Sequence, residues 1–151
     1  MIYRTETLIE ADRDAVWRCL VALNDAPAHV PYLERATLVA GPDLSEGDCV
    51  HLWFDYLGHE FDGEAVVVDL EPGEALGLRA VRPSLGLVVD ARWDLTDAPG
   101  GTRVEMTISL TIDSLLAQLG ARALIGDKVV QDAIAASLAT FSTRVTTGAC
   151  G

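Results

Sequence analysis

The chain has 151 residues, of which 50% are apolar and 23% are charged, and its formal net charge is −12. This apolar content is opposite to the composition of disordered chains, and the length supports a single hydrophobic core. We therefore expect one domain over residues 1–147 with a short tail at 148–151. We expect no nucleic acid partner, because such a partner needs a surface with clustered Lys and Arg, and Lys128 is the only lysine.

The first elements are a strand and a short helical connection. Ile2–Glu10 alternates with the period of a strand, and Asp12 is in position to cap a helix whose apolar residues recur at helical spacing. Proline restricts the helical conformation at and before its own position. Pro27 and Pro31 therefore exclude a second long helix and predict a short helical turn between them.

Six further strands follow, separated by turns rich in Gly, Pro and Asp. The expected strands are Arg35–Val39, Cys49–Leu57, Glu60–Leu70, Ala75–Arg82, Leu85–Thr96 and Thr102–Ile112. The turns are too short to hold a crossover helix, so neighbouring strands must pair antiparallel. The last strands alternate apolar and polar residues, which predicts a sheet with one apolar and one polar face.

The end of the chain has helical periodicity. Apolar residues recur there every three or four positions, at Val130, Ile134, Leu138, Phe141 and Val145. An unbroken helix over Ser114–Thr146 would be about 50 Å long, which exceeds a domain of this size. Gly120 and Gly126 are natural interruptions, with Asp127 able to cap a final helix that ends at Thr146. We expect this helix to cover the apolar face of a curved sheet and to leave space beneath it.

Several segments resemble the START-like superfamily, also called SRPBCC, which includes birch-pollen-allergen-like and polyketide cyclase/dehydrase-like proteins. They are the strand-to-helix junction Ile9–Trp17, the segment Pro31–Ala36, the turn Leu70–Leu76, and Trp93–Leu95 followed by Gly101–Val104. The resemblance implies an α+β helix-grip fold. In it, a curved seven-stranded antiparallel sheet wraps around a long C-terminal α-helix, with two short helices after the first strand. Members bind lipids, sterols, polyketides, quinones or plant hormones, and some are aromatase/cyclases.

A hydrophobic small-molecule ligand is therefore expected between the sheet and the C-terminal helix. The residues expected to bind it are Tyr32, Phe54, Tyr56, Glu64, Leu78, Arg82, Trp93, Met106, Val130, Ile134 and Leu138. Trp93 and Met106 lie on the expected sheet, and Val130, Ile134 and Leu138 lie on the expected helix. For Arg82, an inward orientation and an exposed one are both compatible with the strand pattern.

Acid–base chemistry has three candidate residues: Glu64, Tyr56 and His29. Glu60, Asp62 and Glu64 alternate in step with the apolar end of their strand, so an unbroken strand would direct all three into the cavity. A bulge at Gly63 would instead turn the first two to solvent. A buried Glu64 would have a raised pKa and could donate or accept protons.

The cysteines Cys19, Cys49 and Cys150 form no CxxC pair and resemble neither a disulfide framework nor a zinc ribbon. Cys49 and His51 share a strand face without a second ligand pair. The first ten residues carry charges, and no apolar run is long enough to cross a membrane. We expect a cytoplasmic protein with reduced thiols, no membrane insertion, no metal and no cofactor.

Three functions remain open at this stage. The first is binding of a lipid, polyketide or aromatic metabolite in the cavity. The second is an enzyme, an aromatase/cyclase or dehydratase acting on a polyketide-like substrate. The third is a protein-interaction module that uses the acidic first half of the chain. The pattern does not distinguish a monomer from a homodimer.

Overall fold

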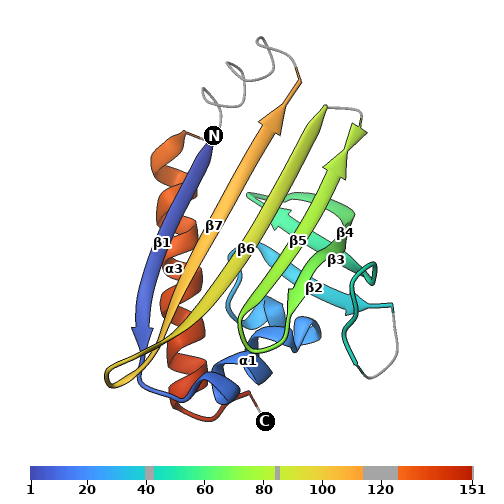
Figure 1. Ribbon diagram of the computed structural model, residues 1–151. Helices are drawn as coiled ribbons and strands as arrows, with labels where there is room; N and C mark the ends of the chain where they lie inside the picture. Colours follow the sequence, from blue (N-terminus) through green and yellow to red (C-terminus); the bar gives the residue numbers. More distant parts are fainter. Residues whose placement is uncertain (40–42, 84–85, 114–125, 151) are drawn as a thin grey trace.

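The computed structural model describes residues 1–39, 43–83, 86–113 and 126–150 (Figure 1). Its elements in chain order are β1 (Ile2–Ile9), α1 (Arg13–Val21), the 3-10 helix η1 (Leu23–Ala28), β2 (Leu33–Leu38), β3 (Cys49–Tyr56), β4 (His59–Glu71), β5 (Ala75–Arg82), β6 (Leu87–Ala98), β7 (Gly101–Ile112) and α3 (Asp127–Thr146). The expected strands are all present, with ends that differ by a few residues. The expected interruption at Gly120 lies outside the described residues.

The strands form one antiparallel sheet in the order β1-β7-β6-β5-β4-β3-β2. β1 therefore lies beside β7, the last strand of the chain. From β7 the order runs back through the hairpins to β2, which forms the opposite edge of the sheet. Helix α3 lies behind β1 and β7 in Figure 1, against the inner face of the sheet. This arrangement confirms the expected helix-grip fold.

Helix α3 contributes its apolar stripe to the core. Ile134, Leu138 and Phe141 are each at most 5% exposed and belong to one cluster with Tyr3 and Val104 of the sheet. Burial of a large apolar side chain stabilises a fold by about 2 kcal/mol, so this stripe is a main attachment of α3 to β1 and β7.

The ends of the helices agree with the predictions in part. Asp12 caps α1, because its Oδ1 accepts a hydrogen bond of 2.7 Å from the amide of Ala15. The expected cap at Asp127 is wrong: Gly126 occupies the N-cap position without a side-chain bond, and the carboxylate of Asp127 accepts a hydrogen bond from the Tyr3 hydroxyl. A tertiary partner on β1 has taken the carboxylate that the local pattern assigned to the helix end.

The helical turn expected between the two prolines lies earlier in the chain. η1 covers Leu23–Ala28 and includes Pro27, and the chain from His29 to Tyr32 is irregular. Proline is compatible with the short 3-10 helix, because few backbone amides are needed as donors there.

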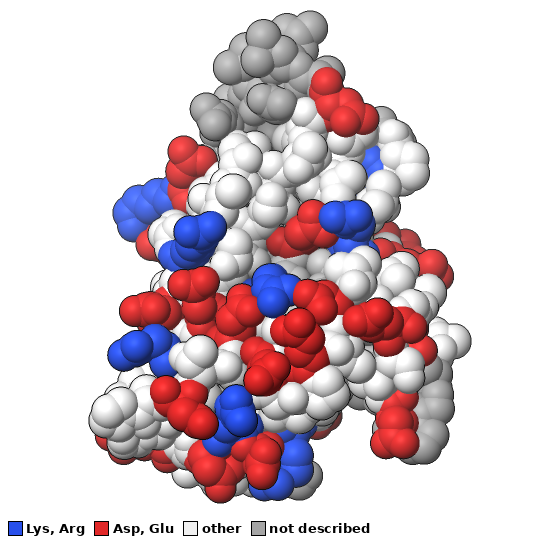
Figure 2. All heavy atoms as spheres, viewed as in Figure 1, with Lys and Arg blue, Asp and Glu red and all other residues white. Residues whose placement is uncertain are grey.

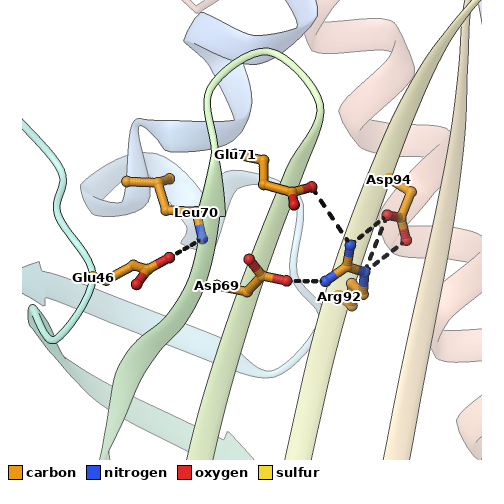
Figure 3. A network of polar contacts seen from close by, with 6 residues as sticks. All are labelled: Glu46, Asp69, Leu70, Glu71, Arg92 and Asp94. Carbon is orange, nitrogen blue, oxygen red and sulfur yellow. Dashed lines mark hydrogen bonds and ion pairs between the residues drawn. The ribbon is translucent and has the colours of Figure 1, made fainter.

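The outer face of the sheet is polar, as the alternation predicts, and Figure 2 shows Asp and Glu side chains gathered over it with Arg among them. Arg92 of β6 reaches across β5 to Asp69 of β4 and also bonds to Asp94, with Glu71 4.0 Å away (Figure 3). Gly77 lies beneath this bridge, and a Cβ there would be 3.0 Å from the Cβ of Asp69. The absent side chain leaves room for the Arg92 guanidinium to cross β5 and to connect β6 with β4.

Candidate functional site

A cavity of about 520 Å³ lies on the inner face of the sheet. On the side opposite the sheet it is bordered by the segment from α1 to the start of β2, through Leu20, Leu23, Ala26, His29, Val30 and Leu33. Strands β3 to β7 supply the side chains of Val50, Leu52, Phe54, Phe61, Ala65, Leu78, Ala80, Arg82, Leu87, Val89, Ala91, Trp93, Met106 and Ile108. The size is within the range of small-molecule sites, and the lining is predominantly apolar.

The pleat of the strands explains why the cavity exists. Successive side chains point to opposite faces, so every second residue of β4, β5 and β6 faces inward. At three of these positions the residue is alanine: Ala65, Ala80 and Ala91. Short side chains at the centre of a concave sheet leave volume that longer ones at the same positions would fill.

His29 is the polar group in the helical wall. Its ring packs against Phe141 of α3 with the centroids 5.1 Å apart, and Nδ1 is buried without a hydrogen-bond partner among the described residues. Burial and, second, the positive charge of Arg144 lower the pKa of His29 from 6.5 to about 4, against a smaller opposite effect of Asp25. The imidazole is therefore neutral near neutral pH.

Two aromatic rings and one guanidinium form a partly exposed edge of the cavity. Phe61 stacks on Phe54 with centroids 5.2 Å apart, and the guanidinium carbon of Arg82 lies 5.3 Å from the centre of the Phe61 ring. Phe61 is 40% exposed. Arg82 thus lies on the inner face of β5 but at the exposed end of the strand. The inward and the exposed orientation, which the sequence left open as alternatives, are therefore both present.

The acidic residues of β4 have the opposite phase to the one considered from the sequence. β3 and β4 pair without interruption through Gly63, and the register shift lies between Val67 and Asp69, on the β5 side. Ala65 and Val67 are buried, so the alternating Glu64 points to the outer face, although it borders the cavity. The prediction of an inward carboxylate assumed that the strand continues unbroken beyond Val67. It is wrong, because a bulge near Val68 shifts the alternation of β4, so that Glu64 does not share the phase of the apolar end of the strand.

The two neighbours of Glu64 in this series have the same outward orientation. Asp62 accepts a hydrogen bond of 2.8 Å from Nε2 of His51 on the outer face. Glu60 is exposed, and ligand oxygens of Glu34, Asp55 and Glu60 lie within 4.8 Å of one another. Exposed carboxylates often gather in this way, and no catalytic arrangement follows from it.

The tyrosines expected at the cavity lie outside its described border. Tyr32 is 47% exposed with a φ of 66°, and its ring meets that of Tyr56 edge-on at 4.9 Å. The three expected helix residues, Val130, Ile134 and Leu138, also do not border the cavity, since they pack in or against the core cluster. The described border of the cavity includes no residue of α3.

The structure therefore brings together six of the expected ligand-binding residues and His29. The six are Phe54, Glu64, Leu78, Arg82, Trp93 and Met106, of which Glu64 borders the cavity with its side chain turned outward. Most of the other residues at the border were not expected, among them Leu20, Leu23 and Phe61. The helical spacing of Leu20 and Leu23 was a usable signal, whereas Phe61 required the correct phase of β4.

The cysteines give a further correction. A disulfide joins Cys19 of α1 to Cys150 after α3, across 131 residues, with the Cα atoms 5.2 Å apart. The expectation of reduced thiols without a disulfide is wrong in this structure. Spacing along the chain could not reveal the pair, because only the folded arrangement brings the end of the chain to α1. Cys49 is unpaired.

Comparisons with known proteins agree on the fold. A family model described as polyketide cyclase / dehydrase and lipid transport matches residues 2–146. No curated protein matches the chain significantly in sequence. No helix in the described part of the chain has the length and apolarity to cross a membrane.

Solved structures with similar folds include TTHA0849 from Thermus thermophilus, at 16% identity with a TM-score of 0.78, covering 98% of this chain and 99% of that one. The ZhuI aromatase/cyclase from Streptomyces sp. R1128 has 18% identity and a TM-score of 0.69, with 96% and 95% covered. Ara h 8.0201 has 15% identity and a TM-score of 0.70, with 97% and 98% covered. At these identities the likeness concerns the fold.

Proposed function

The chain belongs to the polyketide cyclase / dehydrase and lipid transport family, and on that premise we propose that it binds one hydrophobic small molecule in the cavity on the inner face of the sheet. The observation that carries the proposal is the cavity itself, about 520 Å³ with a mostly apolar border. An apolar ligand of lipid, polyketide or aromatic type would bury its surface there and release ordered water.

Binding is favoured over turnover by the chemistry of the wall. Glu64 is turned to the outer face, and the lowered pKa of His29 makes its imidazole a weak base at neutral pH. General acid–base catalysis works best with a group whose pKa lies near the working pH. A cyclase or dehydratase activity through His29 or Tyr56 stays the alternative, and retained ligand binding with lost turnover in a His29→Phe or Tyr56→Phe variant would support it.

The proposal predicts that filling the cavity abolishes binding. Ala91 borders the cavity at the centre of β6, and Ala91→Phe would place a ring inside it. Thr107→Phe on β7 is the matched control, because Thr107 pairs with Arg92, on the outer face. Thermal-shift measurements with fatty acids, quinones, sterols and aromatic polyketides give the readout.

We expect at least one of these compounds to raise the melting temperature of the wild type and of Thr107→Phe, and to leave that of Ala91→Phe unchanged. Shifts of equal size in all three proteins would mean that the compound binds elsewhere. The absence of any shift with all four compound classes would contradict the proposed function.

A further inference from the structure

A disulfide ties the helical wall of the cavity to the end of the chain. Cys19 of α1 is bonded to Cys150, which follows α3, and Figure 1 shows the C-terminus beside α1. The residue after Cys19 is Leu20, which borders the cavity, and both are buried. The S–S bond therefore holds α1 at the position next to one that shapes the binding site.

The backbone at the end of α3 leads into this bond. Gly148 has a φ of 72°, a left-handed conformation that glycine adopts without strain. Its amide donates to the carbonyl of Val145, and the amide of Ala149 donates to that of Arg144, which is the pattern of a Schellman motif. Both hydrogen bonds return to α3, and the S–S bond of Cys150 then joins the tail to α1.

The helical wall is thus attached to α3 at two places, although the described border of the cavity includes no residue of α3. One attachment is the disulfide, and the other is the ring of His29, which packs against Phe141. Without the disulfide, α1 keeps its noncovalent contacts with α3, β6 and β7, and η1 keeps its packing along β2. The disulfide therefore acts mainly on α1.

The pair is open to reduction from the side of Cys150. Cys19 is 3% exposed, whereas Cys150 is partly exposed. One thiolate of a dithiol reductant attacks Sγ of Cys150 and expels Sγ of Cys19, and the second thiolate of the reductant then breaks the mixed disulfide. Two electrons and two protons pass from the dithiol to the chain, which gains two thiols while the reductant becomes a disulfide. A neutral thiol suits the apolar surroundings of Cys19.

We propose that the Cys19–Cys150 pair is a redox switch for the cavity, in which the disulfide form binds an apolar ligand more tightly than the reduced form. This inference rests on the proposed function. A wall that is already held in place has less freedom to lose when a ligand binds, so the cross-link lowers the cost of binding. The coupling is reciprocal, so a bound ligand favours the disulfide by the same factor.

The test uses a chain with Cys49→Ser, in which Cys19 and Cys150 are the remaining cysteines. The mass added by alkylation distinguishes the oxidised form from the form reduced with dithiothreitol. Titration calorimetry with isopropylnaphthalene at neutral pH measures the affinity of each form. The matched control also carries Cys150→Ser and cannot form the disulfide. Hydrogen exchange followed by NMR compares the amide of Leu20 in α1 with that of Met106 in β7.

We expect reduction to weaken binding at least about fivefold, which is the lower end of the usual coupling between two sites. The control should bind like the reduced form, and its affinity should not respond to dithiothreitol. Reduction should accelerate exchange at Leu20 by a larger factor than at Met106, since α1 opens locally. Saturating ligand should lower the reduction potential of the pair by about 20 mV for a fivefold coupling, measured in buffers of reduced and oxidised dithiothreitol.

Four results overturn the switch while leaving the proposed function intact. They are equal affinity of the two forms, equal acceleration of exchange at Leu20 and Met106, binding by the control as tight as that of the oxidised form, and failure of the pair to oxidise. Unfolding of the reduced chain, seen by circular dichroism, also overturns it, because the disulfide would then hold the whole fold. If isopropylnaphthalene binds neither form, the proposed function and the switch both fail.

Discussion

The neutral state of His29 has a consequence for stability that can be measured without any ligand. In the unfolded chain the pKa of this histidine returns to about 6.5, whereas in the folded protein it lies at about 4. Between these two values the unfolded state binds more protons than the folded state. The contribution of His29 to the free energy of unfolding is therefore fully present above the unfolded pKa and is lost as the pH falls toward the folded pKa.

The loss at about pH 5 follows from the two pKa values and amounts to about 2 kcal/mol, approaching about 3 kcal/mol below the folded pKa. The perturbation is His29→Gln, which removes the titrating group and keeps a polar side chain. Urea unfolding of both proteins is measured at a series of pH values. In the difference between their free energies of unfolding, the contributions of the groups that both proteins share cancel, including those of Asp25 and Arg144. We expect the stability difference, wild type minus variant, to fall by about 2 kcal/mol from neutral pH to about pH 5. Parallel curves would refute a buried, neutral His29.

Two further predictions concern the frame around the cavity. Cys150→Ser removes the cross-link that closes a loop of 131 residues, so the free energy of unfolding in the absence of reductant should fall by at most about 5 kcal/mol. The control Cys49→Ser should leave the effect of a reductant unchanged. A melting temperature of the wild type that does not change when reductant is added would contradict this prediction. Gly101→Ala should cost at least about 2 kcal/mol in urea unfolding, because its Cβ would collide with the carbonyl oxygen of Ile9. Gly100→Ala should cost less, because its Cβ meets open space and the strain of its φ of 88° is the main cost. Equal costs for the two glycines would show that Ile9 does not restrict Gly101.

The fold could be predicted from the sequence because its signals are local and repeated. β5 has the predicted ends at Ala75 and Arg82, and β7 alternates as expected, with Val104 and Met106 buried. The helical spacing of Ile134 and Leu138 predicted α3 in the same way. Each of these patterns extends over several residues, so one misplaced turn does not change the assignment.

The site could be predicted only in part, because it depends on single residues and on contacts between distant segments. One irregularity near Val68 decides which face Glu64 takes, and nothing in the residue types marks that position. The proximity of Cys19 and Cys150, and that of His29 and Phe141, exist only once α3 has docked. Trp93 and Met106 were predicted correctly to face inward, since their strands alternate without interruption.

Titration calorimetry at several temperatures, with isopropylnaphthalene on the wild type and on Ala91→Phe, tests the central claim most directly. Burial of an apolar molecule in an apolar cavity has a negative heat-capacity change as its robust marker. The account predicts one molecule bound per chain with a negative heat-capacity change, and no binding to Ala91→Phe. Saturable binding that survives Ala91→Phe unchanged, or no binding to the wild type at any temperature, would contradict it.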